Sequence, residues 1–573
     1  MAKDFTLEIR KFLGYHASQD STQEIADGES PDMVNFKVVD GLMLKKREGY
    51  FSVFSSGTEP IRGIWSGRFD GKWLYLAVVG NTLYRSLTGF SEMEALTGEI
   101  AGEEKVFFFP FHGAVHLLTG EGIFTYEGKE TVAPLEPYVP LIMIATPPAG
   151  NGVVYEEVNL LTREVRQSFS PDGVECRFYP VISTVSEIVW VKMNGVVQKD
   201  DQYYFDEAYS CITFLRIPPE GVDTIEVQYR ISGESAADRI LNCRFAVTFG
   251  GANDTRAFLY GNDDSQAVRY HSGIIEGKPC FSYFPETAYT FIGSGEAITS
   301  ILRHYDRLLI FTETSAYYSY LEYITGVDGN LIAAFPVLPL SDENGCSLRG
   351  QALLLENTPC TFTEKGLFRW VSTNIRDERN AVLFSDPIAY ALEKEQKEHA
   401  LLFHRKATSE LYLCIDGHLY VYNYRLKLFY YYEVPCLKGF AQGEKGLYFY
   451  TENGIYQVGG ETDDGAPIQA CWRSRLLDFG KRKQIKKLFG IVVYTKTKGK
   501  ALVKVHCRKE NRGEVTDFEF HTEEEQEQGV RNLSCSQGNF RLFEVCLETE
   551  GTEPLCVLGL SLRGRITDRS EKR

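Results

Sequence analysis

The chain has 573 residues, of which 43% are hydrophobic and 13% aromatic, and its formal net charge at pH 7 is -17. Such a chain can bury several cores, so we expect a globular protein of more than one domain. The acidic balance disfavours an electrostatic clamp on nucleic acid, which needs a basic surface. No stretch approaches the roughly 20 uncharged apolar residues that span a bilayer, and Met1–Phe5 lacks a signal peptide's apolar core. We therefore expect the protein to be made and kept in the cytosol.

The N-terminal residues 1–60 are predicted to form an arm and a first hairpin. Within them, residues 33–47 alternate polar and apolar side chains around Asp40-Gly41, a dipeptide typical of a hairpin turn.

From residue 61 onward, strand-like runs repeatedly reach a glycine turn and resume with an aliphatic and an aromatic residue. Clear examples are Gly122-Ile123-Phe124, Gly366-Leu367-Phe368 and Gly446-Leu447-Tyr448. Repeated hairpins in units of roughly 40–50 residues are typical of β-propellers. The pattern predicts an all-β chain with a propeller of about seven blades, or six or eight, because the N-terminal hairpin could complete one.

One interval between repeats, from Ile123 to Leu259, is far too long for a single blade. It contains the breaker cluster Pro147–Gly152, followed by strand-like runs of its own. We interpret residues 146–235 as an inserted small β-domain, which divides the propeller into residues 61–145 and 236–460.

The composition changes again after residue 460, and residues 461–573 are predicted to form a C-terminal β-sandwich. Helical periodicity is weak throughout, and its best candidate is residues 386–399, a stretch of about three turns.

Motifs for metal binding and catalysis were sought and not found. The 13 cysteines include no Cys-x-x-Cys pair, and the ten histidines include no His-Glu-x-x-His motif. There is no Gly-x-Ser-x-Gly elbow, phosphate loop or dinucleotide fingerprint in a strand-to-helix context. The turn Phe69-Asp70-Gly71-Lys72-Trp73 has neither the serine nor the spacing of the sialidase repeat. We therefore expect no enzyme activity, no catalytic residues, no metal and no cofactor.

Several short segments carry a family resemblance. They are Phe12–Tyr15, Gly28–Phe36, Asp40–Leu42, Lys46–Tyr50, Arg244–Val247, Asn262–Gly273 and Cys471–Gly480. Together they resemble bacteriophage head-to-tail and tail-nozzle proteins, including the packaged-DNA stabilisation proteins of short-tailed phages. Glu48 stands where these proteins usually have a proline.

The resemblance implies a non-enzymatic virion structural protein that forms a homo-oligomeric ring, with a hexamer favoured. Such a ring lies at the head-tail connector or tail nozzle after assembly in the host cytoplasm. Its partners would be portal, adaptor or other tail proteins. Double-stranded DNA would pass through it and be guided or retained without sequence-specific binding, and no membrane would be involved.

Four acidic loop residues are candidates for lining the channel of such a ring, where like charge would let phosphates slide. They are Asp263, Asp264, Asp463 and Asp464, which alternatively only solubilise turns. Trp190 and Trp472 are candidate interface anchors, or else core residues. Two other functions stay open: a virion-attached propeller that binds or cleaves glycans, and a cellular β-propeller interaction scaffold.

Overall fold

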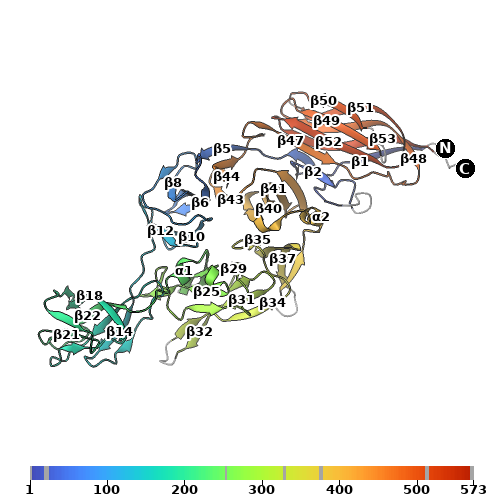
Figure 1. Cartoon of the computed structure of the whole chain (residues 1–573). Helices are drawn as coiled ribbons and strands as arrows, with labels where there is room; N and C mark the ends of the chain where they lie inside the picture. Colours follow the sequence, from blue (N-terminus) through green and yellow to red (C-terminus); the bar gives the residue numbers. More distant parts are fainter. Residues whose placement is uncertain are drawn as a thin grey trace. The chain divides into compact units, whose positions relative to one another are not determined.

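The computed structural model describes residues 3–18, 25–251, 254–326, 331–372, 379–509, 515–524 and 526–567. Regular structure in these ranges is almost entirely β (Figure 1), which confirms the predicted fold class. None of the helices in these ranges is long and apolar enough to cross a membrane. The chain divides into two compact units: unit 1 comprises residues 1–80, 84–94 and 344–573, and unit 2 comprises residues 81–83 and 95–343.

Sheets of four strands recur along the chain, as expected of propeller blades. The first three are β6 (Ile61–Phe69), β7 (Lys72–Val79), β8 (Thr82–Ser86) and β9 (Glu94–Ala95); β10 (Phe107–Phe111), β11 (Ala114–Leu118), β12 (Ile123–Tyr126) and β13 (Val132–Pro134); and β23 (Phe245–Gly251), β24 (Asp254–Tyr260), β25 (Val268–His271) and β28 (Tyr289–Phe291).

Three further sheets follow in the same manner. They are β29 (Ser300–His304), β30 (Arg307–Phe311), β31 (Ala316–Tyr320) and β34 (Val337–Ser341); β35 (Leu353–Leu355), β36 (Thr358–Thr363), β37 (Gly366–Ser372) and β38 (Arg379–Leu383); and β39 (Leu401–Arg405), β40 (Glu410–Ile415), β41 (His418–Asn423) and β42 (Leu428–Glu433). Two side hairpins accompany them, β26 (Gly273–Ile275) with β27 (Lys278–Cys280) and β32 (Glu322–Thr325) with β33 (Leu331–Ala334).

The last group of four strands is completed by a strand from the N-terminal segment. Strands β43 (Gly439–Gly443), β44 (Gly446–Tyr450) and β45 (Gly454–Val458) receive β5 (Tyr50–Ser55) as a fourth strand, with Val458 opposite Tyr50 and Gly454 opposite Ser55. The strand that follows the predicted hairpin, and not the hairpin itself, therefore completes a sheet. Closure of all these sheets into one propeller, and hence the blade number, stays a prediction.

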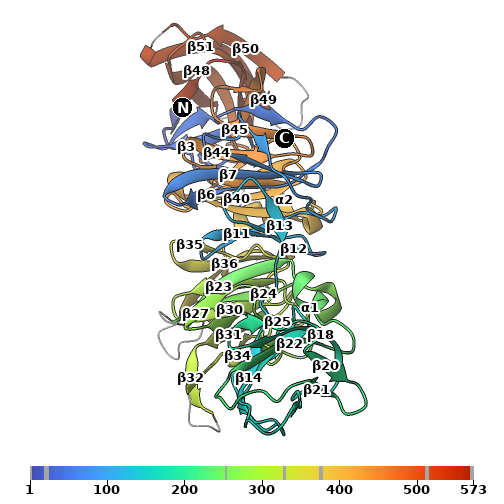
Figure 2. The same cartoon turned by 90° about the vertical axis from the view of Figure 1, so that its left-hand side faces the viewer.

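The segment interpreted as an insertion has its own sheets and its own core (Figure 2). A six-stranded sheet has the order β15-β14-β16-β22-β18-β19, and a three-stranded sheet the order β17-β21-β20. Their bounds are β14 (Leu141–Thr146), β15 (Val153–Val154), β16 (Glu164–Phe169), β17 (Arg177–Phe178), β18 (Val185–Met193), β19 (Val196–Val197), β20 (Tyr203–Asp206), β21 (Cys211–Phe214) and β22 (Ile225–Ile231). Val165, Val191 and Val227 are fully buried between them.

The C-terminal sandwich takes strands from both ends of the chain, and Figure 1 shows the blue N-terminal strands beside the red ones. One sheet holds β1 (Lys3–Ile9), β3 (Phe36–Val39), β4 (Met43–Lys46), β48 (Ile485–Thr497), β51 (Gln526–Phe540) and β53 (Leu555–Thr567). The other holds β2 (Asp32–Val34), β47 (Ala466–Arg473), β49 (Leu502–Lys509), β50 (Val515–His521) and β52 (Phe543–Gly551), and β46 (Thr462–Asp463) links it to β5.

The N-terminal arm is thus part of the sandwich and not a separate element. The predicted hairpin is β3 with β4, in which Val39 lies opposite Met43. Strand β53 then pairs with β4 along its first half and with β1 along its second half. A single long strand can hold both because β1 and β4 each cover only part of its length.

The predicted helix over residues 386–399 is broken into three short pieces. Residues Asp386–Ile388 form a 3-10 turn (η2), Ala389–Leu392 a single α-helical turn (α2), and Lys397–His399 another 3-10 turn (η3). Pro387 lies in the first turn, and Gln396 takes an extended backbone conformation, so the helix cannot continue to His399. The other helical turns are α1 (Asp238–Leu241), η1 (Asp263–Ser265) and η4 (Lys406–Thr408).

Phe12 links the N-terminal arm to the sandwich core. Its ring is fully buried and meets the buried Trp472 edge-on, with ring centroids 5.1 Å apart. We expect Phe12→Ala to lower the free energy of unfolding around this core by about 3–5 kcal/mol, because the cavity cannot be refilled. Denaturant-dependent hydrogen exchange of β47 and β52 measures the loss. Phe51→Ala, at a ring that is 44% exposed, is the control and should change these amides little. Equal effects of the two variants would contradict the role of Phe12 as a link between the N-terminal arm and the sandwich core.

Candidate functional site

Arg47 directly follows β4 and makes hydrogen bonds that join distant parts of the chain within unit 1. Its guanidinium donates two hydrogen bonds to the carboxylate of Asp463, at 2.6 and 2.8 Å, and one each to the carbonyls of Glu48 and Glu433, both at 3.0 Å. Its Nε donates to Asn35 Oδ1 at 2.7 Å. All five donors of the buried group are therefore satisfied, which is what burial of an arginine requires.

Asn35 holds this arginine from the other side of the hairpin. Its backbone is left-handed, with φ of 56°, a conformation that asparagine tolerates better than most residues. Its Oδ1 accepts from Arg47 and from the backbone of Glu433, and its Nδ2 donates to the carbonyl of Gln469 at 2.8 Å. One amide side chain thus connects β42, β47 and the N-terminal hairpin.

Lys46 makes a second set of buried contacts next to Arg47. Its ammonium donates to the carbonyls of Gly551 and Glu553, at 2.9 and 2.8 Å, and more weakly to that of Glu461 at 3.4 Å. Burial lowers the pKa of this lysine, and the carboxylates of Glu461 and Glu553 act in the opposite direction. Lys46 therefore closes the end of the sandwich by binding backbone oxygens.

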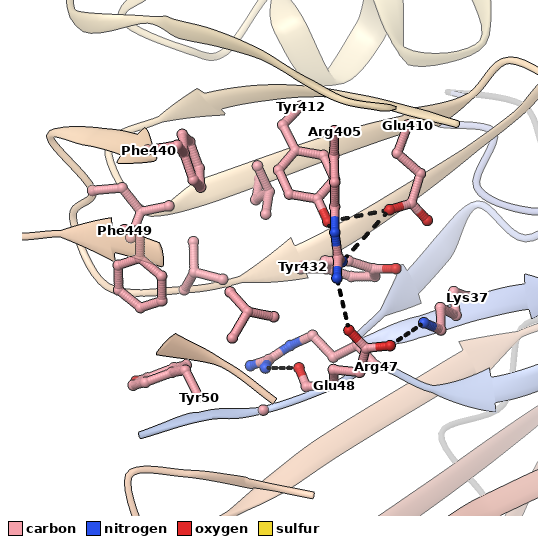
Figure 3. A pocket seen from close by; sticks show the side chains of 15 residues that line it. Lys37, Arg47, Glu48, Tyr50, Arg405, Glu410, Tyr412, Tyr432, Phe440 and Phe449 are labelled. Atoms are coloured by element: carbon pink, nitrogen blue, oxygen red, sulfur yellow. Dashed lines mark hydrogen bonds and ion pairs between the residues drawn. The ribbon is translucent and has the colours of Figure 1, made fainter. Parts of the chain in front are cut away.

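Glu48 lies between two cations beside this junction (Figure 3). Its carboxylate accepts from Lys37 Nζ and from Arg405, each at 3.2 Å. Arg405 also donates to Tyr412 at 3.0 Å and lies 3.9 Å from Glu410. Burial raises the pKa of Glu48, but the two cations outweigh it, so this pKa lies below its usual value. The Glu48 carboxylate is thus held as an ion-pair acceptor.

The cavity at this junction is too small for a ligand as large as a sugar or a nucleotide. Its volume is about 50 Å³, and aromatic rings such as Tyr412, Tyr432, Phe440 and Phe449 line it together with the ion pairs. A space of this size holds a few water molecules but no sugar ring or nucleotide. The arrangement therefore acts as a structural junction between hairpin, blade and sandwich.

Glycine is required where this junction is tightest. A Cβ at Gly49 would lie 1.9 Å from the carbonyl oxygen of Thr462, and one at Gly14 would lie 2.5 Å from that of Phe429. Gly14 also has a φ of 82°. Both belong to segments that carry the family resemblance, so those segments have structural roles in this chain.

Unit 2 contains a larger cavity, of about 620 Å³, between β10–β13 and residues 279–282. Its wall includes Tyr138, Phe281, the carboxylate of Glu136 and the ion pair of Glu127 with Lys129, at 2.7 Å. His116 stacks on Phe281, with ring centroids 3.8 Å apart, and its Nδ1 lies 3.0 Å from Thr125 Oγ1. Burial lowers the pKa of His116 to about 3, so its ring is neutral. A neutral stacked ring beside an ion pair and a carboxylate offers both donors and acceptors to a polar ligand.

The acidic residues singled out in the sequence differ in their surroundings. Asp463 is mostly buried in its pair with Arg47, and Asp263 pairs with Arg244 at 3.0 Å. Asp264 and Asp464 are exposed, and Asp464 Oδ1 accepts from the backbone of Ser52 at 3.0 Å. Whether any of the four faces a channel stays a prediction.

The two tryptophans also differ. Trp472 is fully buried in the sandwich core. Of the two roles that the sequence allowed, interface anchor or core residue, its burial fits the core residue. Trp190 lies partly exposed on β18, with Lys192 Nζ 3.9 Å from the centre of its ring. No pattern in the sequence singles out Arg405 or Glu410. Arg47 lies within the segment Lys46–Tyr50 that carries the resemblance, but nothing in the sequence marks it as a buried ion-pair residue.

Comparisons with known proteins give no family for this chain. No family model matches it, and no curated protein matches it. Among solved structures, a glycoside hydrolase matches with 10% identity over 89% of this chain and 98% of that chain, at a TM-score of 0.22. An exo-β-1,3-galactanase from Phanerochaete chrysosporium in complex with galactose matches with 8% identity over 90% and 100%, at 0.18.

The core factor of S. cerevisiae matches with 8% identity over 53% of this chain and 57% of that chain, at a TM-score of 0.26. These TM-scores are too low for any of the three structures to carry an argument about this chain. Its function is therefore argued from its own residues.

The pair of Asp463 and Arg47 can be tested against its neighbour in sequence. We expect Asp463→Asn to lower the free energy of unfolding of unit 1 by about 3–5 kcal/mol, because it leaves a buried guanidinium without its counter-charge. Asp464→Asn, at the exposed next position, should stay within about 0.5 kcal/mol of the unchanged protein. Urea unfolding compares the two. Equal stability of both variants would mean that Asp463 is merely a solvated loop acid.

Proposed function

We propose that the chain is a non-enzymatic structural protein of a bacteriophage virion, which forms a homo-oligomeric ring at the head-tail connector or tail nozzle. The ring would guide or retain packaged DNA. Support comes from the N-terminal resemblance, whose residues Phe12, Asn35, Lys46 and Arg47 all have roles in holding the chain together. Residues of this kind keep the shape of a scaffold.

The observation that carries the proposal is the exposed apolar surface of the inserted segment. About half of the exposed large hydrophobic side chains among the described residues lie between Val153 and Val222. Strands β15 and β19 are the two edges of its six-stranded sheet, and both carry exposed valines, with Val154 72% and Val197 57% accessible. Concentrated exposed apolar side chains mark protein-protein contact surfaces, and unpaired sheet edges add backbone groups for pairing.

A second copy of the chain suits this surface. Two different edges of one sheet give a head-to-tail contact, and a contact of that type closes into a ring when its rotation allows. We propose that the channel of such a ring is acidic, as the net charge of -17 allows. Asp264 and Asp464, which are exposed, would contribute more to its field than the paired Asp263 and Asp463.

Substitutions on the two edges test this assembly. We expect the unchanged protein to have the mass of a closed oligomer by light scattering after size exclusion. The double variant Val154→Lys with Val197→Lys should be a folded monomer, because buried ammonium groups would oppose the contact. Leu87→Lys, at an exposed position outside the insertion, should leave the oligomer intact. A monomeric unchanged protein, or an oligomer unaffected by the double variant, would contradict the proposal.

Glycan binding is a second candidate function, favoured by the 620 Å³ cavity of unit 2 with its aromatic wall and two carboxylates. Aromatic faces and carboxylate acceptors match the apolar faces and hydroxyls of a sugar.

A glycan array followed by calorimetry tests this candidate. If it holds, one oligosaccharide class binds, and Glu127→Gln and Glu136→Gln each weaken binding roughly 10-fold or more, because a charged acceptor is lost. Glu130→Gln is the control, since this nearby exposed residue does not line the cavity. Absence of binding across the array would remove the candidate.

A further inference from the structure

The outer face of one sandwich sheet gathers two thiols, a carboxylate and an imidazole. Along β47, β52 and β49, alternate residues such as Trp472, Leu547 and Val505 point into the core and are buried. The residues between them point to the other face, and these include Cys471, Cys546, Glu548 and His506. Because β52 lies between β47 and β49, Cys546 and Glu548 have Cys471 on one side and His506 on the other.

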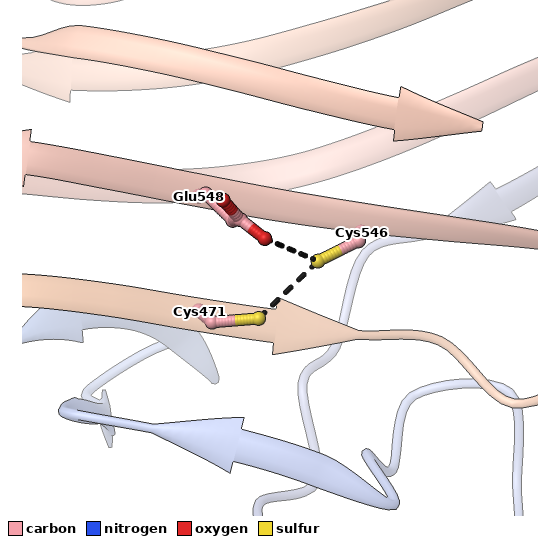
Figure 4. Close-up of side chains that lie close together, drawn as sticks. All are labelled: Cys471, Cys546 and Glu548. Carbon is pink, nitrogen blue, oxygen red and sulfur yellow. Dashed lines mark hydrogen bonds between the residues drawn. The ribbon is translucent and has the colours of Figure 1, made fainter. Parts of the chain in front are cut away.

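The strand register sets the arrangement. Cys471 lies opposite Glu548 in the pairing of β47 with β52, and His506 lies opposite Cys546 in the pairing of β49 with β52. The Sγ atoms of Cys471 and Cys546 are 3.2 Å apart, and Cys546 Sγ is 3.5 Å from Glu548 Oε1 (Figure 4). One ligand atom from each of these three residues lies within 4.8 Å of the other two.

His506 extends the cluster with an unusual set of neighbours. Its Nδ1 lies 2.7 Å from Asp517 Oδ1, and its Nε2 lies 3.3 Å from Glu548 Oε2. Among the described residues, this Nε2 is buried and has no hydrogen-bond partner. The imidazole therefore lies between the carboxylates of Asp517 and Glu548.

We propose that Cys471, Cys546 and Glu548 form a binding site for a thiophilic divalent metal of the zinc type, and that His506, which lies beside Glu548, turns toward the metal as the fourth ligand. Thiolate, imidazole and carboxylate are the ligands that zinc takes in proteins, four at a time in tetrahedral geometry. Thiolates select against calcium and magnesium, which prefer oxygen ligands. Asp517 acts as a positioning residue, since a carboxylate on the far nitrogen fixes the tautomer of a metal-binding histidine.

The metal requires little movement of the thiols. Zinc-sulfur bonds of about 2.3 Å at a tetrahedral angle place two sulfur atoms about 3.8 Å apart, a small increase over the present separation. Cys471 is only partly buried, so its side chain has room to turn. On binding, both thiols lose their protons to the solvent. The bound metal would connect β47, β52 and β49, and the site is independent of ring assembly.

From the sequence we expected no metal, because the spacing of these residues forms no motif. The four ligands come from three strands separated by long stretches of chain, so no compact motif exists. Only the strand register brings them together.

Cobalt is the probe for this site in the full-length, reduced and metal-free protein. We expect one equivalent of Co²⁺ to produce thiolate-to-cobalt charge transfer and the visible bands of tetrahedral coordination. Cys471→Ser and His506→Gln should each weaken Co²⁺ binding strongly, and Asp517→Asn by about 10–100-fold. Cys436→Ser, at an exposed cysteine outside the cluster, should bind as the unchanged protein does.

A second readout is the thermal unfolding midpoint, which Zn²⁺ should raise in the unchanged protein and not in Cys471→Ser, while Mg²⁺ raises neither. Circular dichroism confirms that each variant is folded. Absence of thiolate-to-cobalt absorption in the unchanged protein would overturn the proposal, as would equal absorption in Cys471→Ser. A Cys471-Cys546 disulfide found by mass spectrometry after air oxidation, together with no Co²⁺ binding after reduction, would identify a redox pair and also overturn it.

Discussion

The bidentate pair between Arg47 and Asp463 is the interaction on which unit 1 depends most. A guanidinium has five donors and no acceptor, so its burial is tolerable only when every donor finds an oxygen. Those oxygens come from the hairpin, from the end of β42 and from the turn before β47. Three stretches that lie far apart in the sequence must therefore be in place together, and Lys46 adds the same requirement at the end of β52.

This constraint explains why the N-terminal segment belongs to the sandwich. The chain enters through β1, returns through the β3–β4 hairpin, and leaves as β5 to complete the sheet of β43–β45. Each step pairs an N-terminal strand with a strand from the last third of the chain. Both ends of unit 1 are thereby fixed to each other, and such a subunit suits an assembly that must hold its shape under load.

The local parts of the fold could be predicted from the sequence, and the long-range parts could not. Glycine turns between alternating strands correctly indicated the repeated sheets. The segment after the Pro147–Gly152 cluster has its own core, but its sheet begins before that cluster, at β14. Strands β48 and β51 were missed because lysines flank the apolar run of one, with Lys486 and Lys487 before it and Lys496 after it, and polar residues dominate the other. The expected helix over residues 386–399 is interrupted where Gln396 takes an extended backbone conformation.

The candidate sites show the same division. Asp463 looked like one more acidic loop residue, because its partner Arg47 is hundreds of positions away and only the fold joins them. His506 and Cys471 likewise meet only through the register of β47, β52 and β49. In contrast, the turns of the N-terminal segment could be predicted from the sequence alone, because its glycines and Asn35 are residues that local backbone geometry favours there.

The central claim is that the function of this chain lies in its shape and its place in an assembly. Negative-stain electron microscopy of the purified protein mixed with portal complexes tests it most directly. The account predicts closed rings of this chain, docked at one end of the portal with the two axes aligned. Particles that stay monomeric and never dock under assembly conditions would contradict it.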